Sequence, residues 1–171
     1  EYLLVDGYNI IFAWEELREL AKESLGAAQG RIMDILSNYQ GMRKCTLILV
    51  FDAYKVEGHK EEVLKYHNIY VVYTREAETA DQYIEKTVHK IGREHPVSVA
   101  TSDGLEQMII LGQGASRISA KGLREEIERA GQELRQDWHQ RRQSSRNYLM
   151  DQASPEVAEY VERVRLGKEK P

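Results

Sequence analysis

The sequence starts, after Glu1, with Tyr2-Leu3-Leu4-Val5-Asp6-Gly7-Tyr8-Asn9. The opening run of mostly apolar residues predicts a short strand that is buried on both faces, as strands of parallel sheets are. This strand ends at Asp6, and Gly7 allows a sharp exit because it has no Cβ. Ligands of open parallel sheets bind beyond the carboxyl ends of the strands. We therefore expect Asp6 at the edge where chemistry takes place.

A second apolar run that ends in an acidic residue follows later in the chain. Cys45 to Phe51 is almost continuously apolar, and Asp52 comes directly after it. Since parallel strands end at a common edge, Asp52 is expected near Asp6. The segment 53–67, which follows Asp52, is charged and of mixed composition, which predicts a loop and a short helix. Further strands are expected at 69–73, 97–100 and 117–119.

Helical periodicity fills the gaps between these strands. Helices are predicted at 15–24, 27–42 and 105–111, and another begins after Thr79, where Thr79-Ala80-Asp81-Gln82 has the spacing of a capping box. A long helix is predicted from Leu123, with an apolar stripe that packs on the body as far as Trp138 and then projects or breaks. A final short helix is expected after Ser154-Pro155.

Strands that alternate with helices predict an α/β protein. The expected architecture is a three-layer sandwich with a central, mainly parallel sheet of about five strands and a C-terminal helical extension. With 171 residues, of which 42% are hydrophobic, the chain can bury one core. We expect the main domain at 1–142 and the helical extension, packed on it or projecting from it, at 143–171.

Composition narrows the class of protein. The net charge of −4 disfavours a protein that coats nucleic acid nonspecifically. The charge is uneven, however: residues 117–150 carry eight basic and five acidic side chains, a net charge of +3, and the rest of the chain carries −7. Cys45 is the only cysteine, so the chain offers neither an internal disulfide nor a multi-cysteine metal site. No apolar stretch reaches the roughly 18 residues of a membrane span. A soluble, cytoplasmic protein without membrane partners is expected.

Four aspartates are expected at one edge of the sheet. Each has a structural explanation: Asp6 in a turn, Asp52 at a strand end, Asp81 in a first helical turn and Asp103 as an N-cap. Together, however, they would raise one another's pKa and cost stability unless a cation neutralised them. Oxygen ligands without cysteine or clustered histidine suit Mg²⁺ or Mn²⁺. That metal favours phosphodiester hydrolysis.

Aromatic side chains near these aspartates are candidates for stacking on an unpaired base, although packing explains each equally well. They are Tyr8, Tyr54 and Tyr83. The five histidines lie outside the aspartate motifs, which disfavours a ribonuclease that uses histidine as general acid and base.

The motifs Leu-Val-Asp6-Gly7-Tyr8-Asn9, Val-Phe-Asp52-Ala, Glu78-Thr-Ala-Asp81 and Val-Ala-Thr101-Ser102-Asp103 resemble the NYN domain, a PIN-like nuclease fold, in its YacP-like branch. The resemblance spans roughly residues 2–142. It implies a metal-dependent endoribonuclease that cleaves messenger RNA in association with the ribosome. By this match Asp6, Asp81 and Asp103 hold metal, Asp52 lies in or behind that ligand set, and Asn9 and Ser102 orient ligands or substrate phosphate.

Two other functions remain open. A phospho-acceptor domain of the receiver type would use Asp52 as acceptor, Thr101 or Ser102 and Lys121, but it would want an acidic pair after the first strand and leaves Asp81 without a role. A catalytically silent adaptor for RNA or the ribosome would need only a basic surface. The stretch beyond Trp138 supplies one, and its arginines are candidates for RNA phosphate contacts: Arg141, Arg142 and Arg146.

Overall fold

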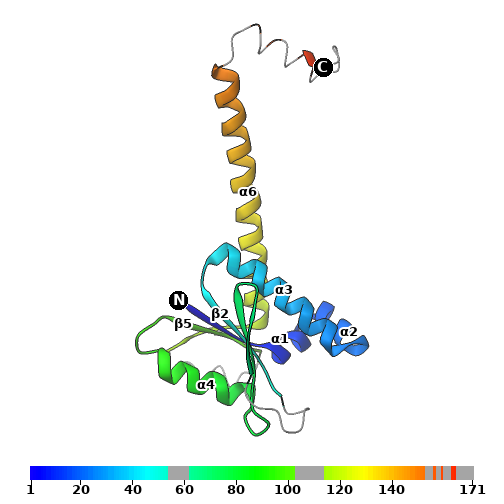
Figure 1. The fold of residues 1–171 in the computed structure, drawn as a ribbon, viewed down its shortest axis with the longest axis vertical. Helices are drawn as coiled ribbons and strands as arrows, with labels where there is room; N and C mark the ends of the chain where they lie inside the picture. Colours follow the sequence, from blue (N-terminus) through cyan, green and yellow to red (C-terminus); the bar gives the residue numbers. More distant parts are fainter. Residues whose placement is uncertain (54–61, 103–113, 153–155, 157–158, 160–162, 165–171) are drawn as a thin grey trace. The chain divides into compact units, whose positions relative to one another are not determined.

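The computed structural model describes residues 1–53, 62–102 and 114–152, together with Glu156, Glu159, Arg163 and Val164; of residues 143–152 it describes the backbone only. The chain divides into two compact units, Glu1–Gly131 and Gln132–Pro171. The first unit contains the sheet and its covering helices (Figure 1). Within the described residues, no helix is both long and apolar enough to span a bilayer.

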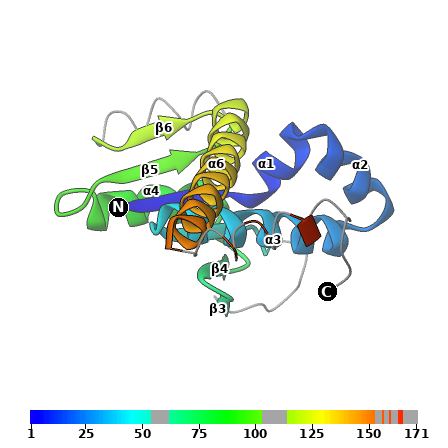
Figure 2. The ribbon, with the colours of Figure 1, turned by 90° about the horizontal axis from the view of Figure 1, so that it is seen from above.

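The described strands form one sheet in the order β3-β4-β2-β1-β5-β6 (Figure 2). All neighbouring pairs are parallel except β3 and β4, which form an antiparallel pair at one edge. β1 lies in the interior, between β2 and β5. The strand bounds are β1 Tyr2–Asp6, β2 Thr46–Phe51, β3 Glu62–Tyr66, β4 Ile69–Tyr73, β5 Val97–Ala100 and β6 Ser116–Ile118.

Helices cover both faces of the sheet, and β1 shows why. Leu3 and Val5 point into one core and Leu4 into the other, since side chains alternate along a strand. The first core is closed by α1 (Gly7–Ala13), α2 (Glu15–Glu23), α3 (Leu25–Arg43) and the start of α6 (Ala120–Gln152), and the second by α4 (Ala80–Ile91). The predicted three-layer α/β architecture is therefore confirmed (Figure 1).

Gly7 joins β1 to α1 where two elements come unusually close. A Cβ on this residue would lie 2.3 Å from Cε1 of Phe51, the buried last residue of β2. The absent side chain lets α1 start directly after Asp6 and pack over the end of β2. The sharp exit predicted from the sequence is thus the first turn of a helix, and the prediction of only two helices between β1 and β2 is wrong.

The 53–67 segment was expected to contain a loop and a short helix, but Glu62–Tyr66 forms strand β3. β3 pairs with β4 across a two-residue turn in which His67 has a φ of 50°. Its side chains are mostly exposed, as at a sheet edge, so it lacks the apolar pattern of the buried strands. With β3, the sheet has six described strands, against the expected number of about five.

Helix α6 begins in the first unit and continues into the second. Leu123 and Ala130 belong to the core, whereas Leu134 and Trp138 are 51% and 65% exposed. The core of the first unit thus includes the predicted stripe as far as Ala130, and the packing of Leu134 and Trp138, which belong to the second unit, stays a prediction. The helix continues without a break to Gln152. The helix predicted at 105–111 lies outside the described residues, as does most of the one predicted after Pro155.

Candidate functional site

A pocket of about 510 Å³ lies at the carboxyl edge of the central strands. β1 supplies Asp6, and Asp52 directly follows β2. Ser102 is the second residue after β5, and Asp81 lies in the first turn of α4. The register aligns Asp6 with Val50 of β2, so these strands end close together. The full lining is Asp6, Tyr8, Asn9, Phe12, Ala13, Asp52, Thr79, Asp81 and Ser102.

Asp6 is the buried acid of this pocket, with only 4% of its surface exposed. It is the N-cap of α1: its Oδ1 accepts a hydrogen bond from the backbone N–H of Asn9 at 3.0 Å, and its Oδ2 accepts one from Asn9 Nδ2 at 3.4 Å. Burial, and then the neighbouring Asp81 carboxylate, raise the pKa of Asp6 to about 7 despite these hydrogen bonds. Asp6 is therefore held where a positive charge would stabilise its ionised form.

Asp52 connects β2 to α4. Its Oδ1 accepts a hydrogen bond from the backbone N–H of Ala80, the first residue of the helix. Burial raises the pKa of Asp52, the Ala80 bond opposes that rise, and the charge of Asp81 adds to it. Asp52 thus helps to fix the helix start that carries Asp81, which agrees with a position in or just behind a ligand set.

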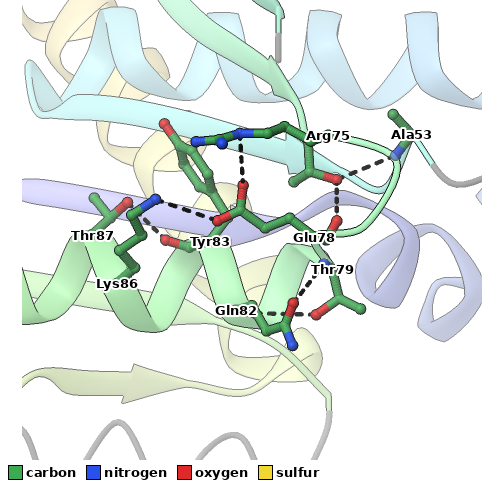
Figure 3. A network of polar contacts seen from close by, with 9 residues as sticks. Ala53, Arg75, Glu78, Thr79, Gln82, Tyr83, Lys86 and Thr87 are labelled. Atoms are coloured by element: carbon green, nitrogen blue, oxygen red, sulfur yellow. Dashed lines mark hydrogen bonds and ion pairs between the residues drawn. The ribbon is translucent and has the colours of Figure 1, made fainter. Parts of the chain in front are cut away.

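The start of α4 is held by a network of side chains (Figure 3). The predicted capping box is confirmed: Thr79 Oγ1 accepts from the backbone N–H of Gln82, and Gln82 Oε1 accepts from that of Thr79. Thr74, fully buried, donates from its hydroxyl to the carbonyl of Glu78 and accepts from the N–H of Ala53.

The Glu78 side chain extends this network along the helix. Its carboxylate lies 3.6 Å from Nζ of Lys86 and 3.9 Å from Nε of Arg75. The short segment that enters α4 is therefore tied to both the helix surface and the loop before it. Asp81, which is exposed, obtains its position from this scaffold.

Asn9 and Ser102 also line the pocket. The Ser102 hydroxyl donates to Oδ1 of Asn9, while the Asn9 amide donates to Asp6. The chain of hydrogen bonds links the end of β5 to the end of β1. Both residues are thus placed beside the carboxylates, as predicted.

Phe12 also lines the pocket, although the sequence patterns predicted no role for it. The signal was present, because Phe12 follows Asn9 at helical spacing. It was missed because Gly7–Ala13 was not predicted to be a helix. Among the tyrosines considered for stacking, Tyr8 lines the pocket and Tyr83 packs against the core beneath α4.

Several predicted residues cannot be placed in the pocket. Asp103 and Tyr54 lie outside the described residues. Arg141 and Arg142 are exposed on α6, in the second unit, and the side chain of Arg146 is not described. The described part of the predicted ligand set is therefore Asp6 and Asp81, with Asp52 beside them.

The donor set suits a hard cation only in part. Asp6 and Asp81 both offer carboxylate oxygens, the ligands that Mg²⁺ and Mn²⁺ prefer, and the charge of Asp81 adds to the need for a counter-charge at Asp6. No group of three or more acidic, histidine or cysteine side chains that could hold a metal ion occurs among the described residues. A complete site would draw a further ligand from water, substrate phosphate or Asp103.

The sequence matches the family model described as the YacP-like NYN domain over residues 3–166. It is 40% identical over 129 residues to the protein YacP of Bacillus subtilis (strain 168), and this match covers 75% of each chain. The crystal structure of Rae1 (YacP) from Bacillus subtilis is similar over 98% of this chain and 96% of that one, with a TM-score of 0.68 and 35% identity. A single-residue variant of Rae1 matches over 80% of each chain with a TM-score of 0.69 and 36% identity. These similarities confirm the predicted family, and the chain belongs to the YacP-like NYN domain family.

Proposed function

We propose that the protein is a metal-dependent endoribonuclease. The observation that supports this most directly is the pairing of the buried Asp6 carboxyl with Asp81 in a pocket at the carboxyl edge of the sheet. Membership of a nuclease-like family agrees with that chemistry. A buried carboxyl such as Asp6, whose pKa is raised by burial and by the neighbouring Asp81, costs stability, which favours a functional explanation.

The chain's own residues have separable roles in this proposal. Asp6, Asp81 and Asp103 would hold Mg²⁺ or Mn²⁺, with Asp52 positioning Asp81 through the helix start. The bound ion would lower the pKa of a water and balance charge on the reacting phosphate. Asn9 and Ser102, already hydrogen-bonded to each other, would orient the phosphate against the carboxylates.

We further propose that the substrate is messenger RNA and that cleavage takes place in association with the ribosome, in the cytoplasm. This finer assignment is supported by the motifs shared with the YacP-like branch and by the basic stretch of α6. Arg141 and Arg142 are exposed there and are available for phosphate contacts.

Cleavage of a labelled single-stranded RNA with Mn²⁺, with Mg²⁺ and with EDTA tests the activity. We expect cleavage with either ion and none in EDTA. The ions should also raise the melting temperature in proportion to the logarithm of their concentration, because they bind the folded state alone. Cleavage that persists in EDTA, with a melting temperature indifferent to both ions, would refute the metal-dependent mechanism.

Asp81→Asn tests the carboxylate assignment, because it keeps the size and hydrogen bonding of the side chain and removes its charge. It should abolish cleavage while the folded structure persists. Glu85→Gln is the matched control: it removes one charge from an exposed position one turn along α4, outside the pocket. Full cleavage by Asp81→Asn would exclude Asp81 from the site, and labelling of Asp52 by a small phosphodonor would favour the phospho-acceptor function instead.

A further inference from the structure

Phe12 is a large apolar side chain that remains 52% exposed at the rim of the acidic pocket. A lone exposed apolar residue needs no special explanation on a protein surface. Phe12 differs because its neighbours in the pocket lining are the carboxylates Asp6, Asp52 and Asp81. An exposed ring in such polar surroundings is suited to a ligand that carries both charge and an apolar face.

Helix geometry fixes the spacing between Phe12 and the polar groups. Asn9 and Phe12 are three residues apart on α1, so they lie on the same side of the helix, separated by a rise of roughly 4.5 Å along its axis. Asn9 in turn donates to Asp6. The ring is thus about one helical turn from the groups proposed to hold the reacting phosphate.

The ring is also backed by other aromatic side chains. Tyr8 stacks on Phe12 with a centroid separation of 6.4 Å and an interplanar angle of 27°. Tyr8 is itself fixed, since its hydroxyl accepts a hydrogen bond from Gln29 Nε2 at 2.9 Å and its ring lies 5.1 Å from that of the buried Phe51. Phe12 is therefore the exposed end of an aromatic row anchored in the core.

We infer that Phe12, supported by Tyr8, stacks on an unpaired nucleobase of the RNA whose phosphate occupies the acidic pocket. This inference rests on the proposed function and names its substrate class as single-stranded RNA. Aromatic side chains bind unpaired bases through the π-face, which every base offers regardless of sequence. Bases inside a duplex are already stacked on their neighbours, so Phe12 selects against paired RNA.

The test compares Phe12→Ala, Phe12→Leu and Phe12→Trp, each in the Asp81→Asn background so that bound RNA is not cleaved. The probe is a fluorescently labelled RNA 10-mer without self-complementarity, and the comparison ligand is its duplex. The loss of one stacked base should weaken single-strand binding by about five-fold to a hundred-fold in Phe12→Ala. Duplex binding should change much less.

Phe12→Leu is the matched control, since it keeps an apolar side chain and removes the aromatic face. It should behave like Phe12→Ala, whereas Phe12→Trp should retain binding. Single-stranded RNA should also quench the tryptophan fluorescence of Phe12→Trp more than that of the Asp81→Asn protein without it, which carries only Trp14 and Trp138. In the enzyme with Asp81 intact, the Phe12→Ala defect should fall on KM more than on kcat. The melting temperature of each variant monitors its folding.

The outcomes separate the two proposals. Suppose that the unsubstituted protein cleaves RNA and the Asp81→Asn protein binds it. If Phe12→Ala and Phe12→Leu in the Asp81→Asn background then bind RNA with the same affinity as Asp81→Asn alone, the stacking inference is overturned and the nuclease function stands. If the unsubstituted protein does not cleave RNA and the Asp81→Asn protein does not bind single-stranded RNA, the proposed function fails and the inference fails with it.

Discussion

In the candidate site, the surroundings of Asp6 favour its protonated form. Asp6 is buried, its carboxyl accepts two hydrogen bonds from Asn9, and its pKa is nevertheless raised to about 7. Desolvation and the Asp81 carboxylate therefore outweigh the favourable hydrogen bonds. Without a cation, the folded protein holds a proton here that the unfolded chain releases near pH 4.

This difference predicts how the stability of the metal-free protein depends on pH. Between about pH 4 and 7 the folded state binds more protons at Asp6 than the unfolded state does, so the free energy of unfolding should fall as pH rises through that window. The Asp6 contribution should be no more than about 4 kcal/mol. Denaturant unfolding in EDTA at several pH values measures this dependence in the wild type and in Asp6→Asn, whose side chain cannot ionise. If the free energies of unfolding of the two proteins changed in parallel with pH, the raised pKa of Asp6 would be contradicted.

Gly7 shows a second constraint at the scale of one residue. Gly7→Ala should destabilise the protein by about 1 to 3 kcal/mol or more, because the new Cβ would overlap the Phe51 ring at the junction of β1 and α1. Gly30→Ala is the control, because Gly30 lies within α3 and a Cβ added there would meet no atom within 4 Å. This substitution should stabilise the folded protein by roughly 0.5 to 1 kcal/mol. Thermal unfolding measures both, and equal shifts would contradict the close-contact argument.

At the scale of the elements, the sequence predicted those with a strong pattern. The apolar strands β1, β2, β4 and β5 and the capping box of α4 were found as expected. β3 was missed because an exposed edge strand has little apolar pattern. α1 was missed because a seven-residue helix offers less than two turns of periodicity, and Asp6-Gly7 is also a turn signal.

The capping box at the start of α4 links an element to the site. Thr79→Ala should lower the free energy of unfolding by about 0.5 to 2 kcal/mol through loss of the Gln82 bond. It should also reduce RNA cleavage by more than the small loss of folded protein explains, because Asp81 lies two residues further on. Thr79→Ser keeps the hydroxyl and should restore both. Cleavage rates measured well below the melting temperature make the comparison, and unchanged cleavage in Thr79→Ala would show that the cap does not position Asp81.

At the scale of the whole molecule, the candidate site could be predicted because strand ends meet at one edge whatever the details of packing. Asp6, Asp52 and Asp81 line one pocket, as expected for the carboxyl edge of a parallel sheet, together with Asn9 and Ser102, which the resemblance to the family implied. Which residues form the rim could not be predicted in this way. Phe12 reaches the pocket only because α1 continues directly from β1, which depends on the packing of Gly7 against Phe51.

The basic stretch of α6 belongs to the second unit of the chain, and its proposed role differs from that of the acidic pocket. Arg141, Arg142 and Arg146 follow one another with no acidic residue between Asp137 and Asp151. A basic surface of this kind binds phosphates without reading sequence, and each contact releases counterions. The unsubstituted protein should therefore bind RNA or ribosomes with an affinity that falls steeply with salt.

Changing Arg141, Arg142 and Arg146 to alanine should remove about two or three phosphate contacts. Each lost contact should reduce the slope of log affinity against log salt by roughly 0.7 to 0.9, with little change in sequence preference. The control is a triple change of equal charge at exposed positions of the first unit, to alanine at Lys65, Lys90 and Arg93. RNA affinity and ribosome co-sedimentation are measured at several salt concentrations, and the stabilisation by Mn²⁺ should survive in both variants. Parallel salt plots for the wild type and the arginine variant would mean that this stretch is a solvated helix surface, since a phosphate contact cannot be lost without a change in slope.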